Sequence, residues 1–158
     1  MMKTVGICLL LFTLFYAVRR LSAAQRARLE LLGEVYDFLR YIRRQVKCYL
    51  LPLKDIAASY STELLERCGF LDRLRSGENP LVSFTGEYRI ADAPMGVLSA
   101  AFSSFGEGYV EDEIRSLDTA IEDMSLLLSK ERAECAKRVK LYSVVGAAIG
   151  VGSLILVI

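Results

Sequence analysis

The chain has 158 residues, and without its two apolar ends the middle is about the size of one ordinary domain. Hydrophobic residues make up 53% of the chain, which is high for a soluble protein and typical of a chain with segments in lipid. The formal net charge of +1 gives no overall reason to expect a nucleic-acid partner.

The sequence contains no histidine and no tryptophan. Without histidine, the commonest general base and metal ligand is missing, together with every Ser-His or Cys-His nucleophile arrangement. We therefore predict no enzymatic activity, no metal or other cofactor and no small-molecule substrate. Isolated packed thiols are expected rather than disulfides or a zinc site, because the cysteines are scattered without a CxxC pair: Cys8, Cys48, Cys68 and Cys135.

The first apolar segment, TVGICLLLFTLFYAV, covers residues 4–18 without a charge and stops at Arg19 and Arg20. With its N-terminal flank it reaches the roughly 17 residues that cross a bilayer. A cleaved signal peptide is the alternative, because the small residues at 22–24 would suit a peptidase. The two arginines before that site favour an uncleaved transmembrane anchor over residues 1–20.

The second apolar segment covers residues 141–158 and follows directly after Lys137, Arg138 and Lys140. Basic residues thus follow the first apolar segment and precede the second, so they lie at both ends of the middle part of the chain. The positive-inside rule then predicts that residues 21–140 form a cytoplasmic domain and that both termini lie outside. The expected localisation is a membrane that the chain crosses twice.

The second predicted span also contains a GxxxG pair, formed by Gly146 and Gly150. Such a pair lets another helix approach closely, so it is a candidate packing site for the first span or for the helix of a partner. The alternative is a generic span, because small residues are frequent in membrane helices.

Two long amphipathic helices are predicted at the ends of the middle domain. The first ends near Leu51, because Pro52 lacks the amide proton that would continue it. The second starts near Val110 and is predicted to run into the membrane as one rod to Ile158. Apolar residues at steps of three and four form a stripe on each helix. The stripes are Leu32, Val35, Leu39, Ile42, Val46 and Tyr49 on the first, and Ile114, Leu117, Ile121, Met124 and Leu128 on the second.

Shorter helices are expected between the two long ones. Gly69 and Gly77 are predicted left-handed caps, and Asn79 followed by Pro80 predicts a helix start. No long stretch alternates with a period of two, so the fold class is predicted as all-α, a helical bundle between the two transmembrane helices. The expected short helices cover residues 52–60, 62–68, 70–76, 80–88 and 94–105.

Two groups of charged residues in the middle domain are candidate partner-binding surfaces. A basic group lies on one face of the first long helix, for which a merely solvated face is the alternative. Seven acidic residues lie between Glu107 and Asp123 against the single Arg115. The two surfaces could pair with each other or with a partner protein. The basic face is Arg40, Arg43, Arg44 and Lys47, and the acids too far along the helix to serve its dipole are Asp118, Glu122 and Asp123.

Three segments carry a resemblance that covers nearly the whole chain: VGICLLLFTLFYAVRRL, AFSSFGEG and KRVKLYSVVGAAIGVGSLILVI. In this order they resemble the stage III sporulation protein AB family of endospore-forming Firmicutes. The chain departs from the family pattern after Phe105-Gly106-Glu107, where it has Tyr109 and Val110 instead of Leu-Gly. Further along, Leu117 stands where the family has glutamine.

The resemblance implies a non-enzymatic subunit of the stage III sporulation complex in the mother-cell membrane around the forespore. Its implied partners are other membrane subunits of that complex, a secretion-type ATPase and membrane lipid, with no nucleic acid. The family's cytoplasmic domain is similar to that of the type II secretion platform protein F. The alternative is a generic helical membrane adaptor or sensor unrelated to sporulation, and an operon with a P-loop ATPase would distinguish the two.

Overall fold

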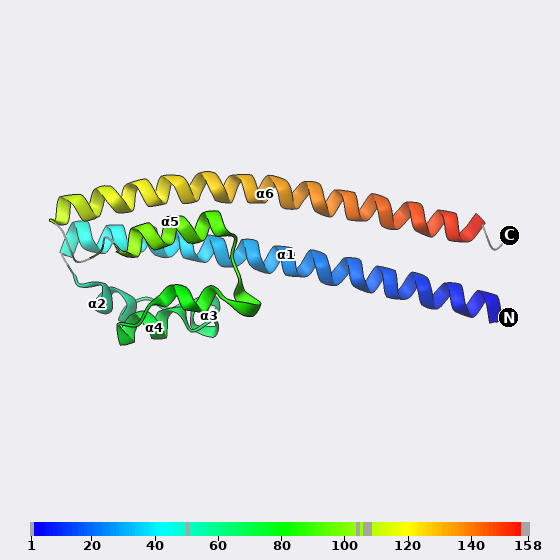
Figure 1. Cartoon of the computed structure of the whole chain (residues 1–158), viewed down its shortest axis with the longest axis horizontal. Coiled ribbons are helices and arrows are strands. Elements are labelled where there is room, and N and C mark those ends of the chain that lie inside the picture. Colours follow the sequence, from blue (N-terminus) through cyan, green and yellow to red (C-terminus); the bar gives the residue numbers. More distant parts are fainter. Residues whose placement is uncertain (1, 50, 104, 106–108, 156–158) are drawn as a thin grey trace. The chain divides into compact units, whose positions relative to one another are not determined.

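The structure is a computed structural model that describes residues 2–49, 51–103, 105 and 109–155. The regular structure in these residues is entirely helical, which confirms the predicted all-α class (Figure 1). The chain divides into two compact units. The first combines its two ends, Met1–Ala27 with Glu131–Ile158, and the second is Arg28–Lys130. The predicted boundaries after residues 20 and 140 concern the membrane and stay predictions.

Two long helices and several short ones make up the described chain. Helix α1 covers Met2–Tyr49, so the first long helix ends close to the predicted residue but is continuous with the first apolar segment, which was not predicted. Helix α6 covers Val110–Ile155 and starts at the predicted residue. The α-helices between them are α2 (Leu53–Ala58), α3 (Glu63–Arg67), α4 (Phe70–Ser76) and α5 (Asp92–Ser103), and the 3₁₀ helices are η1 (Pro80–Phe84) and η2 (Gly86–Tyr88).

Helices α3 and α4 end at left-handed glycines, as predicted. Gly69 has φ 75° and Gly77 has φ 77°, the left-handed conformation that glycine adopts without steric cost. At the end of α4 the Gly77 N–H donates to the Leu74 carbonyl at 3.2 Å, while the Glu78 N–H donates to the Arg73 carbonyl at 2.9 Å. These bonds satisfy carbonyls that a helix end leaves free, so α4 closes at the predicted residue.

The helix predicted over residues 80–88 is present only as two 3₁₀ turns. Its start is as predicted, because the Asn79 side chain accepts a hydrogen bond from the Leu81 N–H at 3.0 Å. Thr85 is extended, with φ −104° and ψ 159°, and Gly86 follows with φ 70°. These two backbone conformations interrupt the helical path, so η1 and η2 are separate.

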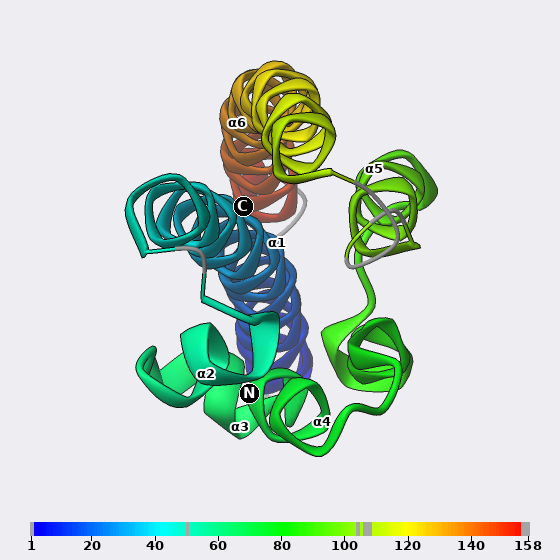
Figure 2. The same cartoon turned by 90° about the vertical axis from the view of Figure 1, so that its left-hand side faces the viewer.

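Within the unit Arg28–Lys130, α6 runs beside α1 (Figure 2), and buried residues of both apolar stripes belong to one hydrophobic core. On α1 the stripe from Leu32 to Val46 is at most 3% exposed. Tyr49 is 69% exposed, so its place in the stripe was wrong; it is the last residue of α1, where the stripe has run past the buried part of the helix. On α6, Leu117, Met124 and Leu128 are buried, and Ile114 and Ile121 pack against the same core half-buried.

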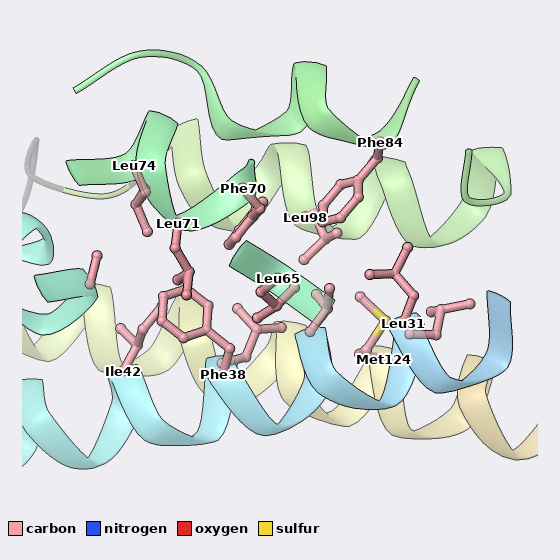
Figure 3. Close-up of a cluster of buried hydrophobic side chains, with 14 of the residues drawn as sticks. Leu31, Phe38, Ile42, Leu65, Phe70, Leu71, Leu74, Phe84, Leu98 and Met124 are labelled. Atoms are coloured by element: carbon pink, nitrogen blue, oxygen red, sulfur yellow. The ribbon is translucent and has the colours of Figure 1, made fainter. Parts of the chain in front are cut away.

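The short helices close this core with an aromatic cluster (Figure 3). The Phe70 ring of α4 meets Phe38 of α1 edge to face at 5.7 Å between centroids, and it stacks on Phe84 of η1 at 5.0 Å. All three side chains are at most 1% exposed. Burying each contributes about 1.5–3 kcal/mol, which holds the short helices against α1.

Arg75 joins α2 and α4. Its Nε donates to the Ala57 carbonyl at 3.1 Å and its Nη2 donates to the Tyr60 carbonyl at 2.9 Å. Its Nη1 also pairs with Asp72 at 3.2 Å. Carbonyls at and after the end of a helix lack intrahelical partners, so the planar guanidinium fixes this end of α2 against α4.

The unit made of the two chain ends carries exposed apolar side chains on both helices. On α1, Phe12 is 71% exposed and Phe15 is 66% exposed, and on α6 Leu141 is 60% exposed. Among the described residues, no helix is sufficiently long and apolar to cross a membrane. The anchors predicted over residues 1–20 and 141–158 include residues 1 and 156–158, which lie outside the described part of the chain.

Candidate docking surfaces

The predicted basic face lies on α1 beside the buried stripe. Arg40, Arg44 and Lys47 are exposed, whereas Arg43 is half-buried. Arg40 also lies over the ring of Tyr36, with its guanidinium carbon 5.8 Å from the ring centroid, a cation–π contact along one helix turn. Three of the four predicted basic residues are therefore presented to solvent.

The fourth basic residue is bound within the chain. Arg43 forms a two-point contact with Asp118 of α6: its Nε donates to Oδ1, and its Nη2 donates to Oδ2 at 3.1 Å. This hydrogen bond, and then the charge of Asp118, raise the pKa of Arg43 above its ordinary value. The two predicted surfaces thus meet at this pair, and Asp118 is engaged inside the unit.

The other two predicted acids, Glu122 and Asp123, are exposed one turn further along α6. Asp123 lines a groove of about 350 Å³ between α5 and α6, and Asp112 lines the same groove. At 1.5 Å per residue, the two aspartates are about 16 Å apart along the helix. The lining consists of Val97, Ala100 and Ala101 from α5, and Asp112, Arg115, Ser116, Thr119, Ala120 and Asp123 from α6.

The floor of this α5–α6 groove is made of small side chains. Ala101 and Ala120 are buried and Ala100 is exposed, so another helix could approach the two backbones closely. The carboxylates of Asp112 and Asp123 have no ion-pair partner among the described residues, and Arg115 is the one basic residue in the lining. The groove suits a helix that carries basic side chains beside a small apolar face.

Sequence reasoning found Asp123 but not the groove. The acids form a stretch of one helix in the sequence, and spacing along one helix does not show that α5 packs beside it and forms the other wall. A usable signal was the run of small residues in α5, which includes Ala100 and Ala101.

The predicted glycine pair has no packing partner in view. Apart from its chain neighbours and the backbone of its own helix, no described atom would lie within 4 Å of a Cβ at Gly146. The side-chain surroundings of Gly150 are outside what the structure describes. The use of this pair for helix packing stays a prediction.

The cysteine and carboxylate side chains were candidates for metal binding and thiol chemistry. No group of three or more cysteine, aspartate or glutamate side chains there could hold a metal ion. Cys48 is an exposed free thiol, and Cys68 and Cys135 are half-buried free thiols. Burial raises the pKa of the Cys68 thiol, which lowers its reactivity at neutral pH.

Comparison of the chain with protein-family models, with curated proteins and with solved structures found no match to any of them. The resemblance to the sporulation family therefore rests on the three quoted segments, and the function is argued from the surfaces.

Proposed function

We propose that this chain is a non-enzymatic membrane platform subunit whose helical domain docks a cytosolic ATPase. Residues 1–20 and 141–158 are its transmembrane anchors, and the domain between them is cytoplasmic. In this proposal the subunit belongs to the stage III sporulation complex between mother cell and forespore, next to other membrane subunits. The resemblance of the three segments supplies that context.

The observation that carries the docking proposal is the α5–α6 groove with its acidic rim. A groove with an apolar floor and unpaired carboxylates at its edge accommodates a basic amphipathic helix, because the floor gives affinity and the charges give orientation. Asp123 lines the groove and the exposed Glu122 precedes it in the sequence, whereas Asp118 is bound by Arg43. The docking acids are thus Asp112, Glu122 and Asp123.

The membrane part of the proposal is supported by the exposed aromatic and aliphatic side chains of the unit formed by the two ends. Phe12 and Phe15 precede Arg19 and Arg20, and Leu141 follows Lys137, Arg138 and Lys140. Lipid would cover such side chains, while the exposed basic residues would lie at anionic headgroups.

The first test is the gene neighbourhood. A P-loop ATPase followed by further membrane subunits in the same operon supports the platform role. An operon without an ATPase would favour the adaptor or sensor.

The second test is capture of that ATPase by the full chain immobilised in detergent. The double variant Glu122→Lys/Asp123→Lys should keep its helix content, because exposed substitutions shift stability by under about 0.5 kcal/mol. Its capture should fall most strongly at low salt, where steering by charge is least screened. The matched control is Glu30→Lys/Asp37→Lys, which makes the same charge change on exposed residues of α1. Equal capture by both double variants at both salt concentrations would reject the acidic docking surface.

A further inference from the structure

Another cavity lies between α1 and the segment that leads into α5, and it shares no lining residue with the α5–α6 groove. Its volume is about 400 Å³, and all of its lining belongs to the unit Arg28–Lys130. Arg28 of α1 forms one side. The segment that leads into α5 forms the other, with Arg89, Ile90, Ala91 and Asp92.

Arg28, on the α1 side of the cavity, has a hydrogen-bond donor without an acceptor. The Nε of Arg28 is buried and has no hydrogen-bond partner, although the residue as a whole is half-buried. Neither Arg28 nor Arg89 forms an ion pair with any described residue. A buried charged donor without an acceptor costs free energy, and proteins normally satisfy such a group. An acceptor from outside the chain would do so.

The charge of the cavity favours an anion. The two guanidinium groups carry two positive charges, and the carboxylate of Asp92 carries one negative charge, so the lining is net positive. Each guanidinium presents donors in a planar fork. The two oxygens of a carboxylate are used up by one fork, whereas a phosphate has enough oxygens to accept bonds from both.

We propose that Arg28 and Arg89 bind one phosphate group in this cavity. Phosphate could come from free phosphate in the cytosol or from the headgroup of an anionic phospholipid. The position of Arg28 suits the headgroup under the proposed topology, since it follows Arg20 by eight residues, about 12 Å of helix. The phosphate site itself does not depend on that topology or on ATPase docking.

The test measures the melting temperature of the full chain, with two arms that separate the two sources. In the first arm, inorganic phosphate is titrated into protein in neutral detergent at constant ionic strength. In the second, protein is compared in nanodiscs of phosphatidylglycerol and of phosphatidylcholine without free phosphate. A ligand that binds the folded state raises the melting temperature by mass action.

In the arm where phosphate or lipid raises the melting temperature of the wild type, Arg28→Gln and Arg89→Gln should each lose that rise. Phosphate binding by each variant should be at least about tenfold weaker. Arg67→Gln is the matched control, because Arg67 is an exposed arginine whose ion pair among the described residues is with Glu63 on its own helix. Arg89 is also exposed, so its variant should fold even if Arg28→Gln does not.

A rise in melting temperature in the first arm alone identifies free phosphate as the ligand. A rise in the second arm alone identifies the lipid headgroup. No increment in either arm would overturn the proposal. The proposal would also be overturned if Arg89→Gln kept the full rise in melting temperature. The same holds if Arg67→Gln lost the rise to the same extent, because the effect would then be general screening of charge.

Discussion

Arg43 of α1 and Asp118 of α6 are 75 residues apart in the sequence and form a two-point ion pair beside the core. The side chains are 41% and 46% exposed. Solvent therefore screens the pair, so it adds little to the free energy of unfolding. Its main effect is to hold the two long helices in one register. It also separates Asp118, which is bound within the domain, from Glu122 and Asp123, which are exposed.

The first prediction is the strength of this pair. A double-mutant cycle with Arg43→Ala and Asp118→Ala should give a coupling energy of about 0.2–1 kcal/mol, as for other exposed pairs. Denaturant unfolding of the full chain in detergent measures it. A coupling above about 2 kcal/mol would show that the pair is far less exposed to solvent than the structure indicates.

The core gives the second prediction, which ranks two substitutions. Leu39→Ala removes a side chain that is fully buried, so it should destabilise the domain by about 2–5 kcal/mol. Ile121 is half-buried at the edge of the same core, so Ile121→Ala should cost less. The same unfolding experiment checks the order, and a larger loss for Ile121→Ala would mean that the α1 stripe is not the centre of the core.

Much of this core could be predicted from the sequence, because a buried stripe repeats with the period of the helix. Leu39 and Met124 follow that period, and Gly77 ends α4 because a left-handed residue was needed there. The Arg43–Asp118 pair, the α5–α6 groove and the cavity beside Arg28 depend on which helices pack together. Periodicity along one helix gives no information on that choice. The 3₁₀ turns were missed because the propensities that start a helix do not specify its hydrogen-bond pattern.

Arg75 carries the third prediction, on the junction of α2 and α4. Arg75→Lys keeps the charge but loses the planar fork that reaches the Ala57 and Tyr60 carbonyls. It should therefore destabilise the full chain by about 1–3 kcal/mol, the cost of leaving partly buried acceptors unsatisfied. Arg67→Lys is the control, because its ion pair with Glu63 is exposed and local. Equal melting temperatures for the two lysine variants would contradict the role of the fork.

The fourth prediction concerns thiol reactivity. The thiolate is the reactive form, and burial raises the pKa of Cys68, so fewer Cys68 thiols are ionised at a given pH than in an ordinary cysteine. Maleimide should label exposed Cys48 before Cys68, and labelling of Cys68 should increase as the pH is raised towards its elevated pKa. Peptide mass spectrometry of the native full chain distinguishes the sites. Faster labelling of Cys68 than of Cys48 at neutral pH would contradict its burial.

The last prediction is the topology, which every membrane part of the proposal requires. Alkaline phosphatase is active only outside the cytoplasm, so a fusion after Ile158 should be active and an insertion after Gly77 should be inactive. Gly77 is a suitable insertion site because it is exposed in the left-handed turn that closes α4. The predicted orientation follows from the positive charge of Arg19, Arg20 and the basic residues before residue 141, because such charge resists transfer across a membrane. A matched reporter that fluoresces only in the cytoplasm, placed at the same two sites, should give the opposite pattern and so exclude poor expression as the cause of a low signal. Active phosphatase after Gly77 together with inactive phosphatase after Ile158 would reverse the orientation and place the α5–α6 groove where a cytosolic ATPase cannot reach it.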